Sequence, residues 1–298
     1  MIVSLLFSPH IRAESERGEW EKWFIKSNKA VSEWFDGAAE GLDLFLAGRK
    51  LTNRPNESFL RIENSTHSME GQEITNSTGL IVNPRLPNLE EFWHLKFYTY
   101  DEQEERRSAK NDYLRQTQRR KNYGASVGMF RKLGSIRTAF QPRIELQDPL
   151  KVSHSLTFES VADSRTFWVN PKIEFYASPE KGVGIFQALN FNFILSKVYA
   201  LTFINQGDYE DRQHLYTVTN GLSLGQILTE QSTLSYNILF TTTNRPSYML
   251  ESYNISVSCN QLIYKRVLDF QIIPNVDFAY TNQFNGVAGL TVVFNLHF

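Results

Sequence analysis

The feature that most constrains this chain is the strict two-residue alternation of its last thirteen residues, 286–298. One register is wholly apolar and contains Ala288, Leu290, Val292, Phe294, Leu296 and Phe298. The other register is mostly small or polar and contains Val287, Gly289, Thr291, Val293, Asn295 and His297. Successive side chains of a β-strand point to opposite faces, so the segment predicts a strand with one apolar face. A soluble β-sandwich and a membrane barrel can both end in such a strand, and the residues upstream must decide between them.

The same alternation recurs from residue 58 onward, with turn signals every 12–17 residues. It is strict in 136–146, 165–176, 229–242 and 266–280, where Phe270 and Ile272, for example, alternate with Asp269 and Gln271. Fourteen strands are predicted, near 58–69, 75–86, 92–101, 122–131, 136–146, 151–161, 165–176, 183–194, 197–207, 213–225, 229–242, 248–258, 266–280 and 286–298. Most are longer than the five or six residues usual in soluble sheets, and they match the roughly 9–11 residues that a tilted strand needs to cross the hydrocarbon of a bilayer.

Composition is compatible with a membrane barrel and excludes a membrane helix. The mean hydropathy is −0.36 and no run of about 18 apolar residues occurs. Alternating lumen-facing and lipid-facing residues keep the average hydropathy of a barrel low. The net charge of −1 gives no reason to expect nucleic acid as a partner, and the single cysteine, Cys259, cannot form an internal disulfide.

Aromatic residues favour the barrel over the sandwich. Phe278 with Tyr280, and Tyr199 with Phe203, lie at strand ends on the apolar face, as in the aromatic girdles of membrane barrels. Long strands also need protected edges, and closure into a barrel removes edges. With its final Phe298, the last strand resembles the terminal strand of Gram-negative outer-membrane β-barrels, including porins. Leu86-Pro-Asn88 and Phe270-Gln-Ile-Ile-Pro274 are similar to stretches of uncharacterised proteobacterial outer-membrane proteins.

The resemblance implies an all-β fold, a transmembrane antiparallel barrel of about fourteen strands with a range of 12–16, located in the cell outer membrane. It also implies that Phe294, Leu296 and Phe298 form an insertion signal for the barrel-insertion machinery. Outer-membrane lipid, and lipopolysaccharide in particular, are then the expected surroundings.

Three regions are expected along the chain. Residues 1–13 are interpreted as the remnant of a secretory signal peptide, and 53–298 as the barrel. Residues 14–52 are interpreted as a periplasmic region whose apolar positions between 18 and 48 recur at helical spacing. This amphipathic helix carries Trp20, Trp23 and Trp34, and it could pack on its own domain, on lipid or on a periplasmic partner. We expect it beneath the barrel, with the lumen left open.

An even number of strands predicts that both termini lie on the periplasmic side. The short turns at 86–88, 132–135 and 162–164 then face the periplasm, and the long connection 101–121 faces outward. Its bases Arg115, Arg119, Arg120 and Lys121 could contact lipopolysaccharide phosphates. A solvated, mobile loop is the simpler interpretation of this connection.

Twelve charged residues fall on the register that faces the lumen, six basic and six acidic. They are Arg61, Arg85, Lys96, Arg137, Arg143 and Lys172, with Glu63, Glu145, Glu159, Glu174, Asp269 and Asp277, and His94 and His154 are placed near them. They predict either a constriction that orients ions or an ion-paired, hydrated plug. Fourteen strands lie between filled eight-stranded barrels and open sixteen-stranded ones, so a narrow pore is expected.

No catalytic, metal or cofactor site is predicted. His154 lies between Ser153 and Ser155, but neighbours in a strand point to opposite faces, so they do not make a nucleophile–base pair. Scattered histidines show no zinc-ligand spacing. The leading prediction is a narrow passive channel for small hydrophilic solutes. The alternatives are a structural or assembly protein that docks a periplasmic partner through its helix and, less favoured, a lipid-modifying enzyme of the outer membrane.

Overall fold

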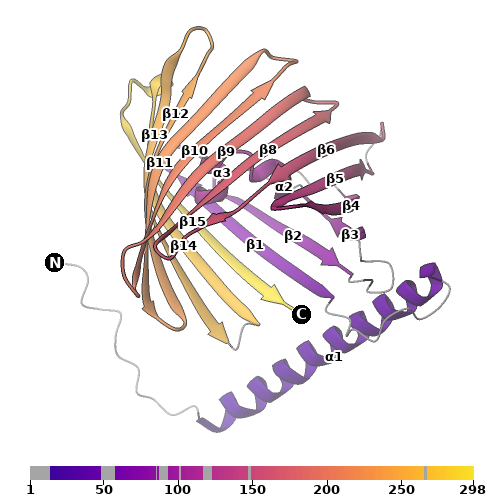
Figure 1. Ribbon diagram of the computed structural model, residues 1–298. Coiled ribbons are helices and arrows are strands. Elements are labelled where there is room, and N and C mark those ends of the chain that lie inside the picture. Colours follow the sequence, from indigo (N-terminus) through magenta and orange to yellow (C-terminus); the bar gives the residue numbers. More distant parts are fainter. Residues whose placement is uncertain are drawn as a thin grey trace.

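The computed structural model describes residues 14–47, 58–84, 86, 93–100, 102–116, 123–146, 149–264 and 267–298. The chain forms a closed antiparallel β-barrel, as predicted (Figure 1). Its strands are β1 (Phe59–Met69), β2 (Thr75–Asn83), β3 (Trp93–Tyr98), β4 (Gly124–Leu133), β5 (Ile136–Glu145), β6 (Lys151–Glu159), β7 (Ala162–Asp163), β8 (Phe167–Ser178), β9 (Gly182–Ile194), β10 (Tyr199–Glu210), β11 (Leu215–Thr229), β12 (Ser232–Thr243), β13 (Met249–Tyr264), β14 (Leu268–Ala279) and β15 (Gly286–His297). A 3₁₀ turn, η1 (Tyr280–Asn282), precedes β15.

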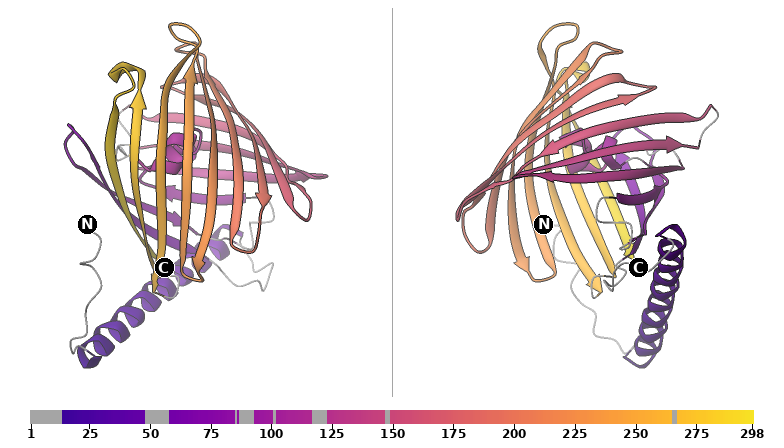
Figure 2. Two further views of the ribbon diagram at one scale, coloured as in Figure 1. Left: turned by 90° about the vertical axis from the view of Figure 1, so that its left-hand side faces the viewer. Right: turned by 45° about the vertical axis from the view of Figure 1, so that its right-hand side comes forward.

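Two pairings close the barrel. β1 pairs with β15 from Arg61↔His297 to Met69↔Gly289, and β6 pairs with β8 from His154↔Ala177 to Glu159↔Lys172. β7 has only two residues and pairs with β8 beside this closure, so the fifteen strands of the sheet make a wall of fourteen. The start of β1 and the end of β15 lie at the same end of the barrel, here called the terminal rim (Figure 2).

Most predicted strand boundaries agree with the structure to within three residues, and the exceptions are the ends of β11 and β13. β11 continues to Thr229, four residues beyond its predicted end at 225. β13 continues six residues beyond its predicted end at 258, through Cys259-Asn-Gln-Leu-Ile-Tyr264, where the clean apolar–polar alternation ends. β3 ends at Tyr98, before the predicted 101, because the chain there leaves the wall and enters the lumen. Hydrophobic alternation shows which face of the sheet a side chain occupies, and it does not show how far the backbone stays paired with the next strand. Predicted strand ends are therefore misplaced where the alternation and the backbone pairing stop at different residues.

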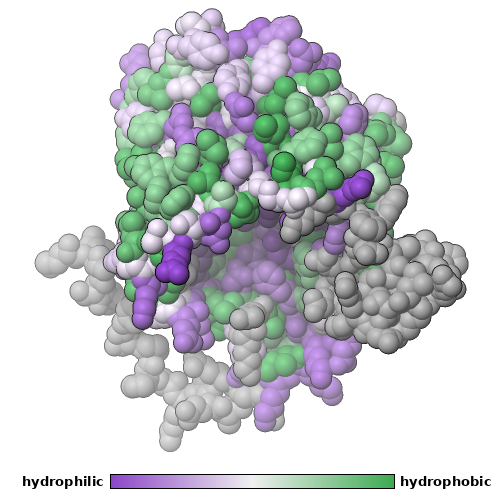
Figure 3. Space-filling model, in the orientation of Figure 1, coloured by the Kyte–Doolittle hydropathy of each residue, from purple (hydrophilic) through white to green (hydrophobic). Residues whose placement is uncertain are grey.

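The two faces of the wall differ in polarity. Large apolar side chains such as Phe240, Ile255 and Phe294 are exposed on the outer face. Inward residues are buried and include Glu63, Asn254 and Thr291. Figure 3 shows hydrophobic residues gathered across the outer wall below a hydrophilic upper rim, with a hydrophilic hollow at the centre. The structure is therefore apolar outside and polar inside, the reverse of a soluble barrel.

The N-terminal helix α1 (Glu14–Ala47) lies outside the lumen, against the terminal rim (Figures 1 and 2). The Asn28 side chain donates a hydrogen bond to the backbone carbonyl of His297 in β15, with a length of 2.8 Å. Within the described residues, no helix has the length and apolar character needed to span a bilayer. The signal-peptide interpretation of residues 1–13 concerns residues outside the described part of the chain.

Candidate functional site

A segment of the chain folds back into the barrel. After β3, the residues 102–116, here called the inserted segment, form two short helices, α2 (Glu102–Glu105) and α3 (Ala109–Leu114), that lie within the lumen (Figure 1). The prediction of a solvated outer loop was therefore wrong for these residues. The run of charged residues predicts exposure to solvent, but its basic side chains pair with buried carboxylates on the wall. Ala109 and Leu114 are fully buried.

The strongest contact of the inserted segment is an ion pair between Arg107 and Glu174 of β8. Both Nε and Nη2 of Arg107 donate hydrogen bonds to Glu174 Oε1, at 3.0 and 2.7 Å. Lys172 Nζ lies 3.0 Å from the other carboxylate oxygen, and the side chain of Glu174 has no exposed surface. The Arg107 guanidinium also stacks over the ring of Tyr176, with 3.9 Å between its central carbon and the ring centroid. A buried carboxylate is tolerated when it is paired in this way by two cations.

A second contact joins the inserted segment to β1. Arg115 Nη1 lies 3.4 Å from both oxygens of Glu63, and Arg61 Nη2 lies 3.6 Å from Oε2 of the same carboxylate. The hydroxyl of Tyr100 donates to that oxygen at 3.2 Å. Arg115 is thus directed inward, and the prediction that it contacts lipopolysaccharide was wrong. Arg119, Arg120 and Lys121 lie outside the described residues.

A third contact reaches β14, where Lys110 Nζ lies 2.7 Å from Asp277 Oδ1. Between these charged contacts lies an apolar cluster in which Ala109 packs with Ile204 of β10 and Leu239 of β12, with Tyr113 against it. Burial raises the pKa of Tyr113, so its ring carries no charge in this cluster. The inserted segment therefore crosses the lumen and contacts strands on several sides.

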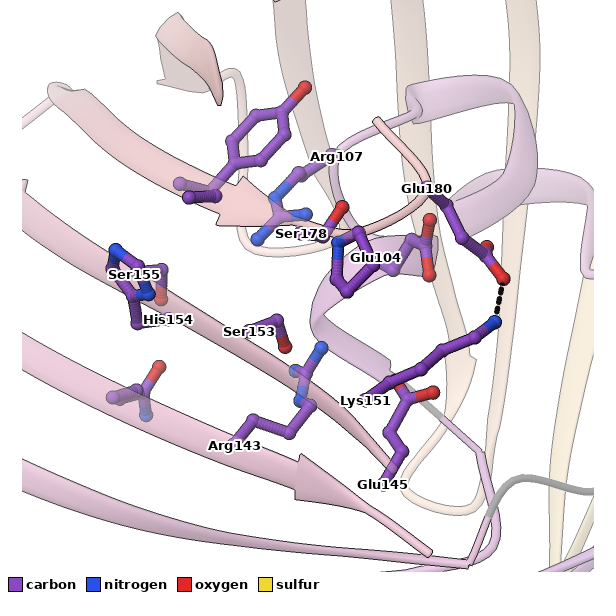
Figure 4. A pocket seen from close by; sticks show the side chains of 14 residues that line it. Glu104, Arg107, Arg143, Glu145, Lys151, Ser153, His154, Ser155, Ser178 and Glu180 are labelled. Atoms are coloured by element: carbon purple, nitrogen blue, oxygen red, sulfur yellow. Dashed lines mark hydrogen bonds and ion pairs between the residues drawn. The ribbon is translucent and has the colours of Figure 1, made fainter. Parts of the chain in front are cut away.

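A charged cavity lies where α2 approaches β5, β6 and β8 (Figure 4). Its charged lining comprises Glu104, Arg107, Arg143, Glu145, Lys151 and Glu180, and Lys151 pairs with Glu180. Its volume is about 30 Å³, enough for one or two water molecules. This cavity itself therefore has room for water and not for a larger hydrated solute.

The structure places eleven of the twelve predicted pore-lining residues on the inner register of the wall, and Arg85 lies outside the described residues. They are Arg61, Glu63, Lys96, Arg137, Arg143, Glu145, Glu159, Lys172, Glu174, Asp269 and Asp277. They do not form one cluster. Glu63, Lys172, Glu174 and Asp277 meet the inserted segment and its partners, whereas Arg137 pairs with Glu159 at 3.3 Å close to the terminal rim. Asp269 pairs with His297 at 2.7 Å, also at that rim.

The sequence analysis did not single out two cations of the site, Arg107 and Lys110. They form the two closest ion pairs between the inserted segment and the wall, yet both lie in a charge run between strands. The available signal was a run of helix-forming residues with a capping serine: Ser108 Oγ accepts from the backbone N–H of Asn111 at the start of α3. A capped helix within a connection indicates a packed segment and not a mobile one.

His154 lies on the outer face of β6, which corrects its placement near the lumen. Its ring is 6.5 Å from that of Phe140, an exposed outer-face residue, whereas Ser155 is buried on the inner side. His154 and its neighbouring serines therefore do not meet. Among the residues that the structure describes, no group of three or more His, Cys, Asp or Glu side chains could hold a metal ion.

No family model matches this sequence, and no curated protein matches it. Several solved structures are similar in fold. OmpT, an outer membrane protein of Vibrio cholerae, has a TM-score of 0.48 at 6% identity, covering 83% of this chain and 99% of that chain. The outer membrane channel DcaP of Acinetobacter baumannii gives 0.46 at 7% identity, with 81% and 96% covered. The KdgM porin gives 0.39 at 6%, with 79% and 98% covered. Likeness at this level assigns no role to any residue of this chain.

Proposed function

We propose that this chain is an outer-membrane channel for small hydrophilic solutes, with its passage set by the inserted segment. One observation carries the proposal: a closed wall, apolar outside and charged inside, is crossed by a segment that is bound to the wall through ion pairs. Lipid requires the apolar exterior, because unpaired backbone or charged groups are costly there.

The inserted segment determines the size of the passage. The cavity between α2 and strands β5, β6 and β8 has a volume of about 30 Å³. The cations Arg107, Lys110 and Arg115 face Glu174, Asp277 and Glu63 on three strands. Acids and bases held at fixed places create a local field across which ions and polar solutes must pass. We assign the selectivity of the channel to this field, and we place both termini of the barrel on the periplasmic side.

Planar-bilayer conductance tests the proposal. The full chain should give small ohmic steps, and a variant with residues 103–115 replaced by a short Gly-Ser linker should give larger ones. The matched control shortens an outer turn, 244–248, and should leave the steps unchanged. Silence of both the full chain and the linker variant, with heat-modifiable migration retained, would reject the channel. It would favour the alternative, a structural or assembly role through α1.

Selectivity gives a second test. Replacing Arg143 and Lys172 with Gln should shift the reversal potential in a salt gradient toward cations, because the neighbouring acids then face the lumen without their bases. Arg131→Gln is the matched control, since Arg131 follows the outer register of β4 opposite Thr138. Equal reversal potentials for the two variants would mean that Arg143 and Lys172 lie off the ion path. We propose no covalent chemistry for this lumen.

A further inference from the structure

Helix α1 presents three different faces. One face, here called the docking face, contains Asn28, Asp36 and Ala39 and lies against the terminal rim. Asn28 donates to the carbonyl of His297, and Asp36 accepts a hydrogen bond from the backbone of Ser58, the residue just before β1. Ala39 is 3% exposed. These contacts hold α1 along the end of the wall where β1 and β15 meet.

A second face carries large apolar side chains that contact no other part of the described chain extensively. Trp20, Trp23 and Trp34 are 63%, 62% and 72% exposed, and Val31 lies between them at 37%. At 3.6 residues per turn, these positions fall on one stripe, about a third of a turn from the docking face. We call them the tryptophan stripe. Trp20 stacks on Phe24 at 5.4 Å, which continues the apolar surface toward the docking face.

The third face is charged. Lys22, Lys26, Lys29, Glu33 and Glu40 are all exposed and fall on the remaining third of the helix circumference. Lys29 pairs with Glu33 at 3.5 Å. One helix therefore meets protein on one side, presents tryptophans on the second and presents charge on the third. A helix with this arrangement fits a position where protein, lipid and water meet.

The position of α1 identifies what covers the tryptophan stripe. The helix is bound at His297, and the adjoining outer face of β15 carries Phe294 and Leu296, where the apolar belt of the wall begins. We propose that α1 lies in the interface of the periplasmic leaflet, with the tryptophan stripe in lipid and continuous with this belt. Indole rings favour the headgroup level of a bilayer, and the three lysines on the flanking face suit anionic headgroups.

Exposure of the tryptophan stripe to water is a poor alternative to contact with lipid. Burial of one large apolar side chain is worth about 1.5–3 kcal/mol, so three exposed tryptophans at a lipid boundary would not stay in solvent. Insertion into the lumen is excluded by the docking contacts at the outer edge of the rim. A periplasmic protein remains the competing occupant, and the experiment below separates it from lipid.

The test compares tryptophan fluorescence in vesicles of phosphatidylcholine and phosphatidylglycerol, with and without bromine on the acyl chains. Trp93 and Trp168 are kept throughout as a constant background. The full chain should lose fluorescence in brominated vesicles, and Trp20→Phe, Trp23→Phe and Trp34→Phe together should remove most of that loss. Phenylalanine retains the apolar surface, so heat-modifiable migration should persist in this triple variant.

The matched control adds Glu33→Trp to the triple variant, which moves the probe to the charged face. It should show no additional bromine-dependent loss. The proposal is overturned if the triple variant is quenched as strongly as the full chain, because the stripe then lies away from lipid and a protein partner takes its place. It is also overturned if the Glu33→Trp variant is quenched as strongly as the stripe. Neither outcome depends on conductance, so the channel and the lipid contact can fail separately.

Discussion

The wall of the barrel has two unequal halves. Strands β8 to β15, leaving the η1 turn aside, have 12–16 residues each, whereas β1 to β6 have 6–11. The long half pairs over nearly its full length. In the short half, the described residues of β2 and β3 pair only at Ile81↔Tyr98 and Val82↔Phe97, extended by the backbone hydrogen bond from Thr99 to Leu80. The short half is therefore the part of the barrel in which the chain leaves the wall and enters the lumen.

The inserted segment originates in the short half and binds mainly to the long half. It leaves the wall after β3, and Arg107, Lys110 and Ala109 then contact β8, β14 and the inner face of β10 and β12. The inserted segment thus belongs in sequence to the half with short strands, while the half with long strands provides most of the surface that binds it. The predictions below test this division, from the largest expected effect to the smallest.

The buried ion pair of the long half should dominate the stability of the inserted segment. Glu174→Gln leaves Arg107 and Lys172 without their carboxylate, and loss of one partner of a buried pair costs about 3–5 kcal/mol. We expect faster protease cleavage within 102–116 and larger conductance. Glu159→Gln is the control from the short half, where the pair with Arg137 is 61% and 42% exposed and should contribute less than about 1 kcal/mol. Equal cleavage of the two variants would contradict the division.

The outer faces of the two halves should respond differently to charge. Phe294 on β15 is paired with Asn64 on β1, and Asn64 already bonds to Asn76 and Thr78 on the outer surface. Phe294→Arg should cost about 2–4 kcal/mol if the residue lies deep in the bilayer, and it should reduce the heat-modifiable fraction. Asn64→Arg should be milder, because it replaces a polar group. The same loss for both variants would mean that the polar residues near Asn64 are no less lipid-exposed than Phe294.

How far the sequence predicts this molecule differs between the wall and the inserted segment. Most of the wall follows from alternation alone: in both halves, strands such as β1, β5, β8 and β15 begin and end within three residues of their predicted bounds. The inward register of the charged residues follows from the same periodicity. The inserted segment does not, because its burial depends on carboxylates on β1, β8 and β14 that are far apart in sequence. Arg107 and Glu174 are 67 residues apart, and no local pattern encodes such a pair.

A smaller effect is expected at the contact with β14. Lys110 and Asp277 are 27% and 14% exposed, so Asp277→Asn should weaken the inserted segment by about 1 kcal/mol through loss of one charged hydrogen bond. Protease cleavage within 102–116 should rise modestly, below that of the Glu174 variant. Asp269→Asn is the control on the same strand, since Asp269 binds Asn295 and His297 at the terminal rim and does not meet the inserted segment. Cleavage in that control should equal that of the full chain.

The smallest effect concerns α1 and the short half, which are joined by Asp36 and the backbone of Ser58. Burial raises the pKa of Asp36, and the hydrogen bond from Ser58 only partly offsets this. The docked helix therefore binds more protons than the undocked one, so docking is strongest at pH values below the ordinary aspartate range and weakens as pH rises through the raised pKa. Hydrogen exchange at the backbone of α1 should accelerate across that window in the full chain. In Asp36→Asn, the exchange rate of α1 should show only the intrinsic pH dependence of amide exchange and no additional change across that window. A full chain whose protection stays constant, or increases with pH, would show that the carboxyl of Asp36 is not held against the rim.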